Sequence, residues 1–349
     1  MPVSVSDRTR NHSRALVLCA VAVVALVAGC GKADNASSIV RTTTNIAGAG
    51  VVGVERDTTK TCPLPSAPDQ AGGTRSVTHA AGVAQVPADP QRIVVLSTAA
   101  LDAACALGLW ERVVGAVTIA GPRPQPQYLG YGVVEIPAIG SAAEPDLAKI
   151  AELRPDVILG ETPGGTAAFD GLQKIAPTVL VGGDDGWQAE FLGYASGLDR
   201  VTAAEQALAD YRVEAANTGN ELAANQSQAS VVRFTPGAIQ IQGSNSFAGQ
   251  VLADAGVQRP TAQRGASADV PPADLEPIEG DIVYVMFDGA GGKTFGEKTL
   301  RSDEFKDLSA ATDKRVFVVE DPVWHGNGLT AARALLTDLR NTLNGYVTD

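Results

Sequence analysis

The sequence predicts an α/β fold of two Rossmann-like lobes with central parallel sheets, joined by one long helix. Three observations carry this prediction. From residue 92 onward short apolar runs alternate with amphipathic helical segments, residues 199–228 then contain no proline and one glycine, and the alternation resumes after them. Strands that alternate with helices are typical of right-handed βαβ units, which build parallel sheets.

Residues 1–29 are expected to be an export signal. Three arginines precede an apolar run at residues 15–28. The run is shorter than the roughly 20 residues that a membrane-spanning helix needs, and a basic region followed by a short apolar region is typical of secretory signals. A buried core helix is the alternative interpretation of this segment.

The sequence Leu-Val-Ala-Gly-Cys at residues 26–30 resembles the bacterial lipobox. The resemblance implies that Cys30 is acylated and becomes the first residue of the mature chain. Acyl chains anchor a protein by burying methylene groups, each worth about 0.8 kcal/mol. The following residues 30–75 are rich in Thr, Ser, Ala, Gly and Pro, which predicts a lipidated flexible tether.

Two cysteines, Cys62 and Cys105, remain once Cys19 leaves with the signal and Cys30 carries the lipid. Outside the cytoplasm such a pair is free to oxidise, so a disulfide between them is expected. The alternative is two unpaired thiols, with Cys105 as a small buried residue on a helix.

The N-terminal lobe is expected at residues 76–198. Its strands are predicted at 92–97, 113–117, 157–159 and 177–182. Helices are predicted at 98–109 and 144–153, where apolar residues recur on one helical face. Pro155 ends the second helix because proline cannot continue the hydrogen-bond ladder.

Residues 199–228 predict a bridging helix, and residues 229–349 a C-terminal lobe. At 1.5 Å per residue the bridging segment can reach roughly 40 Å, more than one sheet needs. The second lobe has predicted strands at 229–234, 238–243, 281–287 and 314–320, and predicted helices at 247–256 and 329–345.

The chain is acidic, with 27 Lys and Arg, 39 Asp and Glu, and a formal net charge of −12. Nucleic acid requires clustered basic residues, so it is excluded as an expected partner. Adhesion to anionic lipid needs basic residues as well, so attachment to the outer face of the cytoplasmic membrane is expected through the lipid on Cys30.

Four segments, taken in order, resemble the class III substrate-binding proteins of ABC importers. They are residues 90–117, 144–162, 245–260 and 316–339, and the resemblance covers residues 90–345. It implies a monomeric, non-enzymatic lipoprotein that captures a ferric siderophore between its lobes and delivers it to an ABC permease. No cofactor is implied, because the iron arrives already chelated.

The crevice of parallel α/β lobes lies beyond the carboxyl ends of the strands, and this rule selects the candidate ligand-binding residues. In the first lobe they are Ser97, Thr98, Arg123, Tyr128, Tyr131 and Trp187. In the second lobe they are Arg233, Phe234, Trp324 and His325.

Each candidate also has an ordinary structural interpretation. The hydroxyls of Ser97 and Thr98 can hold ligand oxygens or cap the following helix. Arg233 offers forked donors to carboxylate or hydroxamate oxygens, and a solvated arginine is the alternative. Trp324 and Trp187 are each expected to offer the ligand an aromatic platform. The alternatives are packing in the core for Trp324 and packing at the hinge for Trp187.

His325 can ligate haem iron through its imidazole, although a lone histidine is more often a hydrogen-bonded loop residue. Haem capture, alone or beside a siderophore, is therefore the first alternative function. A lipid-anchored envelope adaptor with a degenerate cleft is the second. The sequence has no C-x-x-C or H-x-x-x-H pair for a resident metal, and no G-x-S-x-G or H-E-x-x-H motif for catalysis.

Members of the resembled family dock to the permease through an acidic residue on each lobe. Where the first-lobe acid is expected this chain has Ala148, so Glu144 or Asp146 are the candidate substitutes. In the second lobe Asp274 matches the family pattern better.

Overall fold

The computed structural model describes residues 39–40, 44–119, 121, 123–162, 166–182 and 186–347. Two sheets organise this part of the chain, and the predicted fold of two α/β lobes is confirmed. The predicted export signal at residues 1–29, its Cys30 and the tether residues up to 38 lie outside the described residues. Of the described helices, none is long and apolar enough to cross a bilayer.

The N-terminal lobe is built on a sheet of five parallel strands. The strands are β6 (Ile93–Val95), β7 (Val113–Thr118), β8 (Ala138–Ser141), β9 (Val157–Glu161) and β10 (Thr178–Val181), in the spatial order β10-β9-β6-β7-β8. Each neighbouring pair in this order runs parallel. The antiparallel hairpin β4 (Thr74–His79) and β5 (Gly82–Pro87) precedes the sheet.

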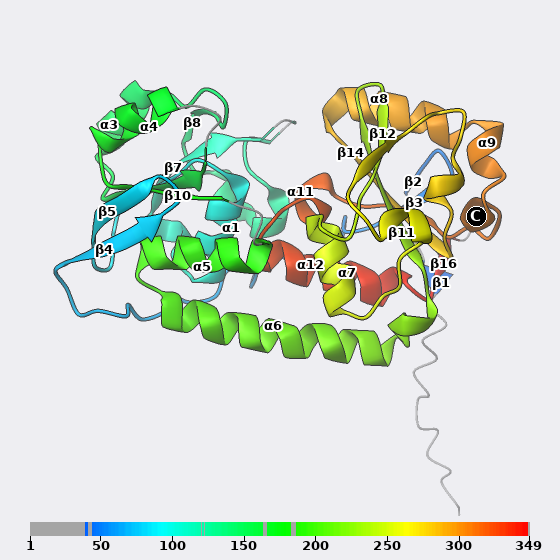
Figure 1. Cartoon of the computed structure of the whole chain (residues 1–349), viewed down its shortest axis with the longest axis horizontal. Helices are drawn as coiled ribbons and strands as arrows, with labels where there is room; N and C mark the ends of the chain where they lie inside the picture. The colour runs from blue at the N-terminus through cyan, green and yellow to red at the C-terminus, as the bar shows by residue number, and fades with distance from the viewer. Residues whose placement is uncertain are drawn as a thin grey trace, which may run out of the picture. The chain divides into compact units, whose positions relative to one another are not determined.

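Helices cover both faces of this sheet. Alternate side chains of a strand point to opposite faces, so the apolar residues of each strand need a helix layer on either side. Its helices are α1 (Thr98–Ala106), α2 (Tyr131–Val134), α3 (Leu147–Leu153), α4 (Thr166–Gln173) and α5 (Trp187–Leu198), with 3-10 turns at Trp110–Arg112 and Gln127–Leu129. In β6, Val94 packs in the cluster that includes residues of α3 and α4. Its neighbours Ile93 and Val95 pack in the main core with α1 and α5. Figure 1 shows the two pairs of helices on opposite sides of the sheet.

The C-terminal lobe is built on a seven-stranded mixed sheet. Its strands are β2 (Asn45–Ile46), β3 (Ala49–Val51), β11 (Ala229–Thr235), β12 (Ala238–Ile241), β13 (Ala268–Val270), β14 (Ile282–Phe287) and β15 (Val316–Val318), in the order β13-β12-β11-β14-β15-β3-β2. The central strands β11, β14, β15 and β3 are parallel, whereas β12, β13 and β2 are antiparallel to their neighbours.

The remaining elements surround this sheet. The helices are α7 (Phe247–Asp254), α8 (Gly289–Leu300), α9 (Asp303–Lys306), α10 (Ser309–Thr312), α11 (Asp321–Trp324) and α12 (Leu329–Thr342). Short 3-10 turns lie at Ala224–Gln226, Thr261–Gln263 and Glu276–Ile278, and β1 (Ile39–Val40) pairs in parallel with β16 (Tyr346–Val347).

The bridging helix is α6 (Val201–Glu221), whose 21 residues lie within the predicted range 199–228. It contacts α5, α7 and α12, and Figure 1 shows all three on the same side of α6, with α5 over one part of its length and α7 and α12 over the other. Its one glycine, Gly219, lies directly against the backbone carbonyl of Ala255, so a Cβ at this position would collide with that oxygen. Glycine in the middle of a helix lowers stability, and this close approach explains why the helix has one at position 219.

Residues 44–75 do not form the flexible tether that their composition predicts. Strand β3 pairs with β15 at the edge of the C-terminal sheet, through Gly50 and Val51. The guanidinium of Arg56 then binds Asp338 of α12 at 3.0 Å and Glu320 at 3.1 Å. Strand pairing and buried ion pairs hold this N-terminal segment (residues 44–75) to the body, and neither leaves a periodic signal in the sequence.

The same segment continues to the first lobe, where the expected pair Cys62 and Cys105 forms a disulfide. Cys105 lies on α1 and is fully buried. Beyond it, Ser66 donates a hydrogen bond to the carbonyl of Leu107 at 2.8 Å. The carboxylate of Asp69 accepts hydrogen bonds from the backbone N–H groups of Val201 and Thr202 at the start of α6.

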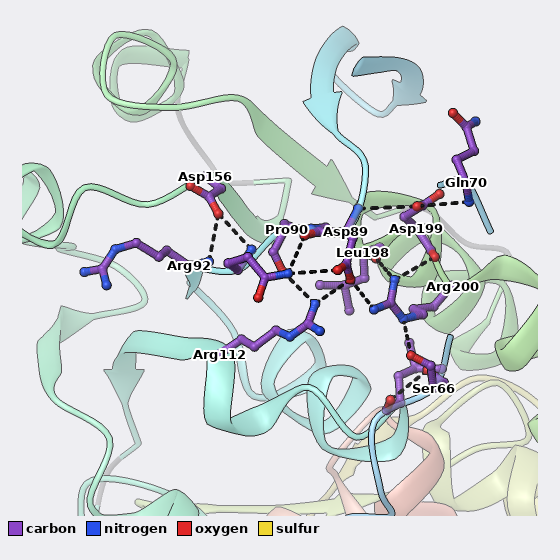
Figure 2. A network of polar contacts seen from close by, with 12 residues as sticks. Ser66, Gln70, Asp89, Pro90, Arg92, Arg112, Asp156, Leu198, Asp199 and Arg200 are labelled. Atoms are coloured by element: carbon purple, nitrogen blue, oxygen red, sulfur yellow. Dashed lines mark hydrogen bonds and ion pairs between the residues drawn. The ribbon is translucent and has the colours of Figure 1, made fainter. Parts of the chain in front are cut away.

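A charged network fixes the start of α6, as Figure 2 shows. The fully buried Arg200 donates through Nε to the carbonyl of Ser66 at 2.9 Å and pairs with Asp89 through Nη2. Asp89 also pairs with Arg112. Because buried charges are stable only when paired and hydrogen-bonded, this network sets the position of the bridging helix relative to the first lobe.

Candidate functional site

A cavity of about 850 Å³ lies between the two lobes, and we call it the interlobe cleft. Its first-lobe wall is formed by Ser97, Thr98, Ala99, Val117, Thr118, Ile119, Ala142 and Glu161. Its second-lobe wall is formed by Gln240, Gln242, Asn245, Ser246, Phe247, Ser267, Ala268, Asp269, His325, Gly326 and Asn327.

The first-lobe wall follows from the direction of the parallel strands. Thr118 and Glu161 are the last residues of β7 and β9, Ala142 follows β8, and Ser97 follows β6. Parallel strands end at one edge of their sheet, so four consecutive strand ends bring these side chains to a single surface.

Ser97 caps the following helix, as one of its two interpretations predicts, and it also lines the interlobe cleft. Its hydroxyl accepts a hydrogen bond from the backbone N–H of Ala100 at 3.1 Å and so caps α1. The same oxygen lies 3.2 Å from the hydroxyl of Tyr194, and the residue borders the interlobe cleft together with Thr98.

Glu161 of the first-lobe wall lies close to Glu190, which is not itself part of the cleft lining. Burial raises the pKa of Glu161 above its ordinary value, and a hydrogen bond from Ser97 opposes this shift. Burial also raises the pKa of Glu190, on α5, to about 7, with a further contribution from the negative charge of Glu161. The amide of Asn327, from the other lobe, donates a hydrogen bond to Glu190. Asn327, a cleft residue of the second lobe, is therefore hydrogen-bonded to a carboxylate of the first lobe.

The second-lobe wall is formed mainly by amide and hydroxyl side chains of β12, of the loop between β12 and α7, and of the loops before β13 and α12. Gln240 donates to the carboxylate of Asp269 at 3.1 Å. Ser246 caps α7 by accepting from the backbone N–H of Gly249. Phe247 adds an almost fully buried aromatic ring to this wall. The amides and hydroxyls of this wall can therefore donate hydrogen bonds to ligand oxygens and accept hydrogen bonds from ligand N–H and O–H groups.

His325 borders the interlobe cleft and is exposed in it. It ends α11 as its C-cap residue. Desolvation by the cleft walls around the ring and the positive charge of Arg233 lower the pKa of its imidazole, while the charges of Asp321 and Asp288 oppose the shift. The imidazole is therefore neutral at pH 7 and can offer a lone pair.

The two predicted tryptophan platforms lie in the core, which corrects the prediction. Trp324 is fully buried, donates through Nε1 to Asp338 at 2.9 Å, and packs on Tyr284 with ring centroids 4.3 Å apart. Trp187 is fully buried between Tyr211 of α6 and Phe247 of α7. Each indole packs between secondary-structure elements, which is the structural alternative that was open for a large apolar side chain.

Arg233 and Phe234 also lie outside the cleft lining. Arg233 is paired with Asp321 at 2.6 Å and with Asp288 at 3.2 Å. Phe234 is fully buried against Phe287. Successive residues of a strand face opposite ways, so one of the two was bound to enter the core.

Of the three candidates in the segment after β7, Tyr128 is buried, whereas Tyr131 and Arg123 are exposed. Tyr128 is buried and donates to the carboxylate of Asp102 at 2.9 Å, so it is a structural residue and the prediction of a ligand contact is wrong for it. Tyr131 is 75% exposed and Arg123 is exposed, and neither is part of the cleft lining.

The candidate docking acids are on the surface of their lobes. Asp146 caps α3 by accepting from the N–H of Lys149 at 3.1 Å, and also pairs with the ammonium of that residue. Glu144 precedes it and is exposed. In the second lobe Asp274 is exposed between β13 and the turn at Glu276–Ile278.

Several cleft residues have no signal in the sequence that would have selected them. Gln240, Gln242 and Asn245 are neutral amides in or after a short strand, a pattern typical of any surface strand. Glu161 could have been found, because it ends a fully apolar strand at the edge where ligands bind. In the described part of the chain no group of three or more His, Cys, Asp or Glu could hold a metal ion.

Comparison with known proteins agrees with this geometry. Residues 93–323 match the family described as periplasmic binding protein. The chain is 30% identical over 283 residues to the Bacillus subtilis protein named "Probable siderophore-binding lipoprotein YfiY", covering 76% of this chain and 86% of the relative. It is 23% identical to the Escherichia coli "Fe(3+) dicitrate-binding periplasmic protein FecB", covering 71% and 83%.

Solved structures show the same fold. Staphylococcus aureus SirA complexed with staphyloferrin B aligns with a TM-score of 0.68 at 25% identity, covering 78% of this chain and 99% of SirA. Bacillus subtilis FeuA complexed with ferri-bacillibactin aligns with a TM-score of 0.65 at 21% identity, covering 77% and 98%. Two lobes around one cleft, the matched residues and these alignments lead to one conclusion: the chain belongs to the periplasmic binding protein family.

Proposed function

We propose that this protein is the substrate-binding lipoprotein of an iron-uptake ABC importer and captures a ferric siderophore in the interlobe cleft. The observation that carries the proposal is a cavity of about 850 Å³ walled by both lobes. Ligand sites of small molecules have volumes of roughly 300–1,000 Å³ and bury most of the ligand, which fits a compact metal chelate. The names of the relatives and of the ligand-bound structures support the same substrate class.

Binding needs no metal ligand from the protein. The siderophore fills the coordination sphere of the iron, so the walls have only to recognise its outer surface. Hydroxyls of Ser97, Thr98 and Ser246 and the amides of Gln240 and Asn245 supply donors and acceptors for this purpose. Phe247 supplies an apolar face.

A thermal-shift panel tests the proposal. Ferric hydroxamate, catecholate and citrate chelates are each added to the protein, with the iron-free chelators as controls. A chelate present at 100 times its dissociation constant stabilises the folded state by about 2.7 kcal/mol and so raises the melting temperature. Quenching of tryptophan emission gives a second readout, because Trp187 packs on the cleft residue Phe247. If every chelate leaves the melting temperature unchanged, an adaptor role replaces the transport role.

His325 favours haem as a second candidate ligand. Its imidazole is neutral at pH 7 and borders the cleft. Titration with haem distinguishes the two ligands, because iron ligation shifts the Soret band and the shift is lost in His325→Ala. If His325→Ala still shows the Soret shift on adding haem, the imidazole of His325 is not the iron ligand.

The remaining parts of the proposal concern the membrane. Acylation of Cys30 would hold the lobes at the outer face of the cytoplasmic membrane, and Cys30→Ala should move the protein from the membrane fraction to the soluble fraction. Glu144 or Asp146 on one lobe and Asp274 on the other would meet basic residues of the permease.

A further inference from the structure

The ionisable groups of the interlobe cleft are acidic, with one histidine. Among the described residues that line it, Glu161, Asp269 and His325 are ionisable, and none is a lysine or arginine. At the undescribed positions from residue 120 onward the sequence also contains no lysine or arginine. The charge that a bound chelate meets at the walls is therefore negative.

Glu161 of the first-lobe wall and its neighbour Glu190 have no basic partner among the described residues that would cancel their charge. Burial raises the pKa of both Glu161 and Glu190, the negative charge of Glu161 raises that of Glu190 further, and no cation contributes to either shift. The contacts of the pair are neutral, from Ser97 to Glu161 and from Asn327 to Glu190. A charge in this position interacts strongly with a ligand, because the walls of a cleft exclude water and focus its field.

Two arginines of the second lobe lie close to the cleft, and other groups of the protein hold both. Arg233 is paired with two aspartates, Asp321 and Asp288. Arg259 is 7% exposed and lies behind the wall, where its Nη2 donates to the carbonyl of Gln242 and to the side chain of Gln263. Neither guanidinium is part of the cleft lining.

We propose that the interlobe cleft selects ferric chelates of neutral or positive charge, with an ammonium or another donor group of the ligand placed against Glu161. This inference rests on the proposed function and adds the substrate class. Polyanionic chelates such as ferric dicitrate bring carboxylates to a wall that already carries them, and like charges brought together across an interface oppose binding. Amide and hydroxyl groups of the second-lobe wall suit the carbonyl oxygens of a hydroxamate chelate.

Ferrioxamine B and ferrioxamine E form a matched pair of probes. Both are trihydroxamate chelates of similar size, but the linear B form carries a free ammonium and the cyclic E form is uncharged. Isothermal titration measures the affinity of the protein for each, with ferric dicitrate as the polyanionic probe. We expect ferrioxamine B to bind about tenfold more tightly than ferrioxamine E, the size of one hydrogen-bonded charge contact, and ferric dicitrate to bind most weakly.

Glu161→Gln tests the residue. The variant removes the carboxylate while keeping the shape of the side chain, so the preference for ferrioxamine B over ferrioxamine E should disappear and the affinity for ferric dicitrate should rise. Glu152→Gln is the matched control, because Glu152 is exposed on α3 and lies outside the cleft lining. In the wild-type protein, added salt should weaken the binding of ferrioxamine B more than that of ferrioxamine E, a test that needs no variant.

The outcomes separate this inference from the function on which it rests. If no chelate of any charge binds, the proposed function fails. If chelates bind, but ferric dicitrate binds more tightly than ferrioxamine B or Glu161→Gln leaves the order of affinities unchanged, the charge selectivity is wrong while the transport role stands.

Discussion

Asp102 of α1, in the first lobe, accepts a hydrogen bond at 2.8 Å from the backbone N–H of Thr330 at the start of α12. Its other oxygen accepts from the N–H of Ala331 at 2.9 Å and from the hydroxyl of Tyr128. Asp102 is fully buried, and burial raises the pKa of its carboxyl to about 6. At neutral pH the carboxylate is therefore ionised and lies at the positive end of the α12 dipole.

This contact should make Asp102 important for stability. In Asp102→Ala two backbone N–H groups and one hydroxyl lose their acceptor, and we expect a loss of about 2 kcal/mol in the free energy of unfolding. Asp102→Asn should lose less, because its amide oxygen still accepts. Urea denaturation measures both, with Asp170→Ala on the exposed part of α4 as the control. An unchanged midpoint in Asp102→Ala would show that this carboxylate does not stabilise the lobe junction.

The disulfide between Cys62 and Cys105 should stabilise the protein by closing a long loop. The two cysteines are 43 residues apart, and in the chain-entropy description a loop of this length is worth about 4 kcal/mol. The double variant Cys62→Ala/Cys105→Ala should therefore melt at a lower temperature, while its chelate affinity stays close to that of the wild type because neither cysteine borders the interlobe cleft. Equal melting temperatures would mean that the strand pairing of β3 and the polar contacts of Arg56, Ser66 and Asp69 hold the N-terminal segment in place without the disulfide.

The elements that could be predicted from the sequence are those whose signal is local. Runs such as Ile93–Val95 and the helical stretch of α6 specify buried strands and a long helix by composition and period. The N-terminal segment was missed because its order comes from partners more than 250 residues away, such as Asp338 for Arg56. No pattern near Arg56 records that pairing.

The candidate site was predicted less well, for a related reason. Trp324 stands beside glycines after a strand, as a ligand platform would, but its indole is held by Asp338, a residue of a later helix. The cleft is lined instead by amides such as Gln240 and Asn245, which occur in any polar surface. Strand direction predicted the first-lobe wall at Ser97, because that rule depends on topology and not on side-chain type.

We expect Glu190, which interacts with the cleft residue Glu161, to make chelate binding depend on pH near neutrality. Its pKa is about 7, so its ionised fraction rises from about one tenth at pH 6 to about nine tenths at pH 8. A ligand cation favours the ionised carboxylate, and the affinity for ferrioxamine B should therefore increase with pH over this range. The affinity for uncharged ferrioxamine E should stay constant.

The groups that face Glu190 are Glu161, Asn327 and Tyr194. The pKa of Tyr194 is raised well above 10 by burial, so its hydroxyl stays neutral in this range. His325, whose pKa is lowered, also stays neutral above pH 7. Isothermal titration at several pH values of wild type and Glu190→Gln checks the assignment: a pH dependence that survives in the variant would contradict it and point to Glu161, whose pKa is also raised.

The docking acids should affect transport without affecting binding. Glu144→Lys and Asp274→Lys each place a cation where a basic permease surface is expected, and like charges oppose docking. Uptake of the iron chelate by cells should fall in each variant and fall further in the double variant, while chelate affinity in solution stays unchanged. Asp146 is less suitable for this test, because its substitution also removes the N-cap of α3, worth about 1 kcal/mol. Glu152→Lys, on the same helix and exposed, controls for the added charge. Normal uptake in the double variant would show that the permease recognises other surfaces of the two lobes.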